Sequence, residues 1–183
     1  MTVPVSEELL DIVDQNDRVI GVKTRGEIHA QGLMHRSVHI LVFNSNAELF
    51  IQKRSMSKDN EPGLWDSSAA GHVDSGENYH CCAIRELGEE LGIEVSTPLD
   101  ELFRLPASPI TGMEHCIVYR CMSDGPLVLQ AEEIDDGAWV SVSEMDRRVA
   151  ESDPVLTHVL RHIWGKYRQK MDASASTGQM TAG

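Results

Sequence analysis

The segment from Gly71 to Ile93, GHVDSGENYHCCAIRELGEELGI, constrains this chain more than any other part of its sequence. Residues 78–91 have the spacing of an amphipathic helix, whose apolar side carries Cys82, Ala83, Leu87 and Leu91. Gly92 follows directly, and glycine commonly ends a helix because it adopts the left-handed conformation without steric cost. The segment therefore predicts one helix that packs an apolar side on the core.

Three glutamates converge on the other flank of this helix. Glu86 and Glu90 are four residues apart, and Glu89 lies three residues from Glu86. Two like charges about 5 Å apart repel by roughly 3 kcal/mol at an effective dielectric of about 20. A helix with a purely structural role gains nothing from this repulsion. Mg²⁺ or Mn²⁺ would turn this repulsion into attraction, because hard cations take carboxylate oxygens as ligands. The simpler alternative is an acidic, solvated helix face with Gly71 as an ordinary turn glycine.

Arg85 is the one cation inside the acidic segment. It lies four residues before Glu89 and within reach of Glu77 at the start of the helix. A guanidinium cannot bind a metal ion, so we expect Arg85 to orient a carboxylate ligand.

The spacing of this segment resembles the signature of the Nudix hydrolases. That signature is Gly, five residues, Glu, seven residues, Arg-Glu, an aliphatic residue, any residue, Glu-Glu, any residue, Gly and an aliphatic residue, and all of its positions are filled here. The resemblance implies a single α+β domain with a mixed sheet sandwiched between helices (α/β/α). It also implies metal-assisted water attack on a small-molecule diphosphate joined to a group X.

The resemblance further implies roles for individual residues. The metal ligands would be Glu86, Glu89, Glu90 and the Gly71 carbonyl, and the catalytic residues would be Glu86, Glu90, Arg85 and Glu133. The position of the general base stays open: it is a glutamate of the helix, or Glu133, with Glu114 and Glu132 as further candidates. Substrate binding is expected at Lys53, Arg54 and Trp65, with Lys58 as another possible phosphate contact.

A wider resemblance, over residues 9–145, connects the chain with the Nudix branch that contains isopentenyl diphosphate isomerase. That isomerase holds a metal with three histidines and two glutamates, and His29, His35, His72 and Glu114 match those positions, although the spacing from His29 to His35 differs by one residue. Ala70 replaces the catalytic cysteine of that branch, and Gly112 replaces its earlier glutamate. These replacements favour hydrolysis over isomerisation, and a third reading is a nucleotide-binding module without catalysis.

Length, charge and composition set further limits. The 183 residues suit one domain over residues 1–170, and the polar segment 171–183 predicts a disordered tail. A net charge of -13 argues against a nucleic-acid polymer as partner, and no apolar run is long enough for a membrane span. Four cysteines without a disulfide or zinc pattern indicate reduced thiols and a cytoplasmic location. Family analogy alone favours a homodimer.

Hydrophobic patterning predicts the remaining elements. Two hairpins are expected, one around Gln15-Asn16-Asp17 and one around residues 44–47, with a short helix or turn at residues 25–33 between them. Further strands are expected near residues 102–105, 113–121, 127–130 and 137–142, and helices at 143–150 and 154–170.

Overall fold

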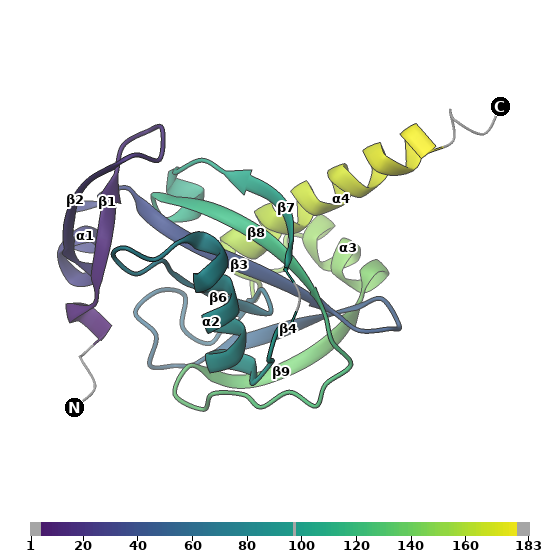
Figure 1. The fold of residues 1–183 in the computed structure, drawn as a ribbon. Helices are drawn as coiled ribbons and strands as arrows, with labels where there is room; N and C mark the ends of the chain where they lie inside the picture. Colours follow the sequence, from purple (N-terminus) through teal and green to yellow (C-terminus); the bar gives the residue numbers. More distant parts are fainter. Residues whose placement is uncertain (1–4, 97, 179–183) are drawn as a thin grey trace.

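A mixed seven-stranded sheet is built around β3 (His35–Phe43), in which eight of nine residues are buried. The computed structural model describes residues 5–96 and 98–178 (Figure 1). β3 runs parallel to β8 (Glu114–Met122) and antiparallel to β6 (Ala69–His72), and it meets β4 (Glu48–Arg54) only near their connecting turn. Such burial on both faces suits its near-continuous run of Val, Ile and Leu.

The other elements surround this centre. β5 (Trp65–Asp66) and β9 (Ile134–Ser141) pair with β4, and β7 (Asp100–Leu105) pairs with β8. β1 (Leu9–Val13) and β2 (Val19–Thr24) form a separate hairpin, followed by α1 (Arg25–Gln31). The main helices are α2 (Tyr79–Leu91), α3 (Val142–Ala150) and α4 (His158–Gly178), and two short 3₁₀ turns are η1 (Val5–Glu7) and η2 (Pro109–Thr111).

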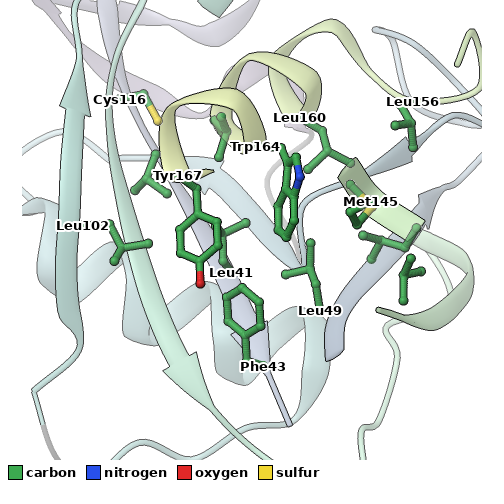
Figure 2. Packing of buried hydrophobic residues seen from close by; sticks show 14 of the residues in the cluster. Leu41, Phe43, Leu49, Leu102, Cys116, Met145, Leu156, Leu160, Trp164 and Tyr167 are labelled. Atoms are coloured by element: carbon green, nitrogen blue, oxygen red, sulfur yellow. The ribbon is translucent and has the colours of Figure 1, made fainter. Parts of the chain in front are cut away.

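Helices cover both faces of the sheet, as the α+β, α/β/α expectation requires. Alternate residues of β3 enter different cores, because successive side chains of a strand point to opposite faces. Val38, Ile40 and Val42 pack with the apolar side of α2. Leu41 and Phe43 pack with α3 and α4, where Figure 2 shows them beside Trp164, Tyr167 and Met145.

The predicted central helix is confirmed at both ends. The Asn78 side chain caps α2 by accepting a hydrogen bond from the Cys81 backbone N–H, and Gly92 ends the helix with φ of 65°. Cys82, Ala83, Leu87 and Leu91 are all fully buried, so the apolar side faces the core as predicted.

Two sequence expectations were wrong in detail. Residues 127–130 form no strand, because their N–H groups at Val128 and Gln130 bond instead to the carbonyls of Leu91 and Glu90 at the end of α2. The last helix begins at His158, since residues 154–157 pass beside β5 and the Thr157 hydroxyl accepts from Leu160 N–H. It also continues to Gly178, past the expected boundary at residue 170; residues 179–183 of the expected tail lie outside the described residues.

All four cysteines are unpaired, with Cys81 exposed and the others buried. Cys116 and Cys121 fall in opposite cores, on the two faces of β8. Within residues 5–96 and 98–178, no helix combines the length and apolar character that crossing a bilayer needs.

Two glycines offer a matched test of this packing. A Cβ on Gly137 in β9 would lie 2.2 Å from the ring of Phe50, which is 5% exposed, whereas a Cβ on Gly165 in α4 would meet no atom within 4 Å. Gly137→Ala is expected to lower the free energy of unfolding by about 1–3 kcal/mol through overpacking. Gly165→Ala should raise it by about 0.5–1 kcal/mol, because alanine favours the helix. Urea unfolding measures both, and equal effects would contradict this packing.

Candidate active site

The site is built where α2 crosses β6. Gly71 lies on β6 directly beside Glu86, and a Cβ at Gly71 would stand 1.9 Å from Glu86 Oε1. Any side chain at this position would displace the carboxylate. The glycine is therefore required by close approach of helix and strand, and not by a turn.

Glu86 and Glu90 are buried acids, with 8% and 4% of their surfaces exposed. Glu90 Oε2 accepts hydrogen bonds from Gln52 Nε2 at 2.9 Å and from Ala70 N–H at 3.1 Å. Burial, and then the neighbouring Glu90 carboxylate, raise the pKa of Glu86 to about 8. Burial likewise raises the pKa of Glu90 to about 7. The raised pKa values mean that the two carboxyls do not readily ionise at the same time. Such a buried pair is a candidate site for a cation.

Arg85 makes both contacts that its spacing allowed. Its guanidinium bonds to Glu77 through Nε at 3.1 Å and Nη2 at 3.0 Å, and Nη1 donates to Glu86 at 2.7 Å and to Glu89 at 3.1 Å. Nη2 also donates to the His72 carbonyl at 3.1 Å, so Arg85 connects α2 to the end of β6. Glu89 differs from the other two glutamates, because 55% of its side chain is exposed.

These residues border a cleft of about 1040 Å³. Among the predicted site residues, those that line it are Gly71, Arg85, Glu86, Glu89, Glu90, Glu133 and Arg54, together with the alternative bases Glu114 and Glu132. Lys58 also lines the cleft and pairs with Glu133. Burial lowers the pKa of Lys58, while the Glu90 carboxylate acts in the opposite direction.

The structure does not bring Lys53 and Trp65 to the cleft, since neither is among the described residues that line it. Side chains alternate along β4: Gln52 reaches Glu90 and Arg54 lines the cleft, so Lys53 faces the other way. Trp65 pairs with Lys53 across β4 and β5 and packs against the core beneath α4.

Two residues of the site, Gln52 and Arg25, were missed in the sequence. Gln52 is 3% exposed and donates a hydrogen bond to Glu90. The sequence pattern that could have revealed it is a polar residue on the same strand face as the apolar Phe50, two positions earlier. Arg25, at the start of α1, lines the cleft with its Nε buried and without a hydrogen-bond partner. Arg25 lies far from the acidic segment in the sequence, so no local pattern connects it with the site.

A second group of side chains able to bind a metal ion includes His72 and Glu114, which line the same cleft. His29, His35, His72 and Glu114 each place a ligand atom within 4.8 Å of the others. The three imidazole rings have centroids 5.0–5.1 Å apart. The one-residue difference in spacing therefore does not prevent His29 from joining the other two.

The polar atoms of this group suit a cation. His35 Nδ1 lies 2.9 Å from the Leu33 carbonyl, so in the tautomer that donates there, Nε2 presents a lone pair. That Nε2 is buried without a hydrogen-bond partner and lies 3.5 Å from Glu114 Oε1. Burial lowers the pKa of His29 to about 4 and also lowers the pKa of His72. Burial would raise the pKa of Glu114, but the nearby His35 and His72 hold it well below its usual range. The lowered pKa values of His29 and His72 favour neutral imidazoles, which is the state that metal ligation needs.

Comparison with known proteins identifies the scaffold. Residues 33–160 match the family described as NUDIX domain. The chain belongs to the Nudix family. A relative from Pseudomonas aeruginosa, named uncharacterized Nudix hydrolase PA4841, is 43% identical over 133 residues, which cover 73% of this chain and 78% of the relative.

Two further Nudix comparisons bear on the branch and the fold. A protein from Photorhabdus laumondii named isopentenyl-diphosphate Delta-isomerase 2 is 30% identical over 163 residues, covering 87% of this chain and 89% of that protein. The crystal structure of DR0079 from Deinococcus radiodurans has a TM-score of 0.77 at 29% identity, with 87% of this chain and 98% of that one covered. The Nudix fold and the resemblance to the isomerase-containing branch are thereby confirmed.

The raised pKa values predict how the stability of this Nudix domain depends on pH when EDTA removes divalent ions. The folded state keeps the protons of Glu86 and Glu90 up to about pH 8 and 7, whereas the unfolded chain releases them near the ordinary value of 4.5. The folded state therefore binds more protons in this window, and stability falls as pH rises through it. Glu86→Gln should reduce this fall by about 1–3 kcal/mol between pH 5 and 8.5 in urea unfolding.

Glu89→Gln is the matched control, because that side chain is 55% exposed. We expect its stability profile to follow the wild type. A Glu86→Gln profile that is as steep as the wild type would contradict the burial of this carboxyl.

Proposed function

We propose that this Nudix protein hydrolyses a diphosphate linkage in a small molecule, either a nucleoside diphosphate joined to a group X or a related organic diphosphate, with Mg²⁺ or Mn²⁺ as cofactor. The single observation that carries the proposal is the pair of buried carboxyls, Glu86 and Glu90, held beside a side-chain-free strand position in a cleft. Arg25, Arg54 and Lys58 line the same cleft and supply local positive charge for phosphates.

The donor set fits a hard divalent cation. Glu86, Glu89, Glu90 and the Gly71 carbonyl would hold it, since they offer only oxygen ligands. When bound, the ion supplies charge neutralisation at the phosphates and acidifies a water molecule. Arg85 keeps Glu86 and Glu89 in place, as Gln52 and the Ala70 N–H do for Glu90.

In the proposed reaction a water oxygen attacks one phosphorus, and the bridging P–O bond breaks to release two phosphorylated products. A carboxylate must accept the proton of that water. Glu133 is our first choice outside α2, because it lines the cleft and its pairing with Lys58 holds it there. Glu90 or Glu86 is the alternative base. Glu114 is disfavoured because its Oε1 lies 3.2 Å from His72 Nε2 and 3.5 Å from His35 Nε2.

A second metal centre is supported by the group of His29, His35, His72 and Glu114. Nitrogen-rich ligation of this kind suits zinc or another transition metal more than Mg²⁺. Isomerase activity, the second candidate function, would use this centre, yet Ala70 and Gly112 stand where that branch has a thiol and a carboxylate. We therefore expect no exchange of solvent protons into isopentenyl diphosphate.

The unpaired cysteines are compatible with the cytoplasmic location we propose. A homodimer stays a prediction from family analogy.

Gly71→Ala tests the role of the strand glycine. The added methyl would displace the Glu86 carboxylate, and we expect kcat/KM for diphosphate hydrolysis to fall about 100-fold or more, because small misplacements are costly in catalysis. Gly88→Ala is the control on α2, the helix that carries Glu86, since its Cβ would approach nothing closer than 4.0 Å. A panel of nucleoside diphosphate derivatives, dinucleoside polyphosphates and prenyl diphosphates, with Mg²⁺ in excess, provides the assay. A wild-type protein that leaves the whole panel intact would refute the hydrolysis.

The histidine group is tested by metal content and affinity. We expect purified protein to bind Zn²⁺ or Mn²⁺ there, and His35→Ala to weaken that binding by more than about 100-fold. His80→Ala, on α2 and beside Tyr119, is the control that should keep it. The affinity is measured by titrating the protein with the metal ion and quantifying the bound metal by inductively coupled plasma mass spectrometry. Equal affinity of His35→Ala and wild-type protein would contradict a metal centre at this place.

A further inference from the structure

A second groove, of about 560 Å³, lies between β7, the segment 106–110 and α4. No Asp or Glu is among the described residues that line it, although the chain has 29 acidic residues against 16 Lys and Arg. Its cationic and apolar walls include Arg104, His162, Lys166, Lys170, Phe103 and Ile110. The groove is therefore a basic concavity on an acidic protein.

The positive charge of this groove is only partly compensated. Arg104 donates two hydrogen bonds to Glu101, at 2.7 and 3.0 Å, and Lys170 Nζ donates to the Leu102 carbonyl. Neither Lys166 nor His162 has a hydrogen-bond or ion-pair partner within the described part of the chain. The Lys166 ammonium beside a fixed guanidinium is suited to an anion, and phosphate is one of the anions that arginine and lysine bind.

The groove adjoins the cleft of the candidate active site. Ile110 lines both, and α4 runs from one to the other: His158 lines the cleft, and His162 and Lys166 line the groove. Residues four apart lie on the same side of a helix, and eight residues of helix span about 12 Å. A substrate whose diphosphate occupies the cleft can therefore extend into the groove.

Apolar surface between the two sites fits the middle of such a substrate. Ile110 is 52% exposed although it is a large aliphatic residue, and Phe103 and Pro106 add further apolar lining. An exposed apolar contact of this kind favours a ring or an alkyl segment over another charged group.

We propose that the groove binds a second phosphate group, carried by the part of the substrate that lies beyond the scissile diphosphate. The substrate class is then a nucleoside diphosphate derivative that bears an additional phosphomonoester. Lys166 and Arg104 are its specificity-determining residues. This assignment rests on the proposed hydrolysis, because it presumes that the diphosphate lies in the cleft.

Matched pairs of substrates that differ by one phosphomonoester test the assignment, such as dephospho-coenzyme A with coenzyme A, and NADH with NADPH. In at least one pair, we expect kcat/KM to be at least tenfold higher for the member with the extra phosphate. The gain should come from a lower KM and not from a higher kcat. Lys166→Gln and Arg104→Gln should each reduce that preference severalfold, and together abolish it. Hydrolysis of the member without the extra phosphate should stay within twofold of wild type.

Arg168→Gln is the matched control, because Arg168 lies on α4 but pairs with Asp146 at 3.1 Å and does not line the groove. It removes the same charge and should leave the preference unchanged. Equal kcat/KM within every pair, or a preference that survives in the Lys166→Gln, Arg104→Gln double variant, would overturn the proposal.

Failure of the hydrolysis itself is distinguishable. If wild-type protein cleaves no member of any pair, isothermal titration calorimetry with the same pairs and Mg²⁺ tests phosphate binding in the groove independently of hydrolysis. Tighter binding of a phosphorylated member that Lys166→Gln abolishes would retain the groove as a phosphate site without hydrolysis. Equal binding of both members would overturn it.

Discussion

This site depends on one constraint: two carboxyls are buried beside Gly71, a strand position that has no side chain. Glu86 and Glu90 belong to the helix that also supplies Cys82, Leu87 and Leu91 to the core, so the helix cannot rotate to expose them without losing that packing. Gly71 lets the helix approach the sheet until Glu86 meets the strand backbone. The hydrophobic core thereby holds the acids together, and the proposed cation would offset the cost of their proximity.

Much of this arrangement was predictable because it is local. Helix periodicity, the Asn78 cap and Gly92 define α2 from neighbouring residues, and the spacing of Glu86, Glu89 and Glu90 follows from that helix. Strand parity was available as well: in ELFIQKR, Gln52, which bonds to Glu90, and Arg54, which lines the cleft, alternate with Lys53, which does neither. The failed strand at residues 127–130 has a different cause, since tertiary bonding to the end of α2 overrode an apolar pattern.

The histidine group shows where sequence spacing stops being informative. His29 lies on α1, His35 begins β3, and His72 ends β6, so a helix and two paired strands place the rings. Gly32, in the left-handed conformation with φ of 60°, ends α1 and turns the chain toward β3. A helix, a turn and a strand advance by different lengths per residue, so the number of residues between His29 and His35 does not measure the distance between their rings.

The charge distribution bears on how so acidic a chain could bind the anionic substrate that we propose. At physiological ionic strength, exposed charges are screened beyond about 8 Å, so the net charge of -13 has little effect on a phosphate already inside a cleft. What matters there is the local set of cations. Arg25, Arg54 and Lys58 line the cleft together with the carboxyls of α2, and Arg104, Lys166 and Lys170 line the groove farther along α4. Ile110 lines both. In the proposed arrangement the cleft would hold the scissile diphosphate and the groove would bind the remainder of the molecule. The catalytic residues could then stay fixed while the groove determined which diphosphates are accepted.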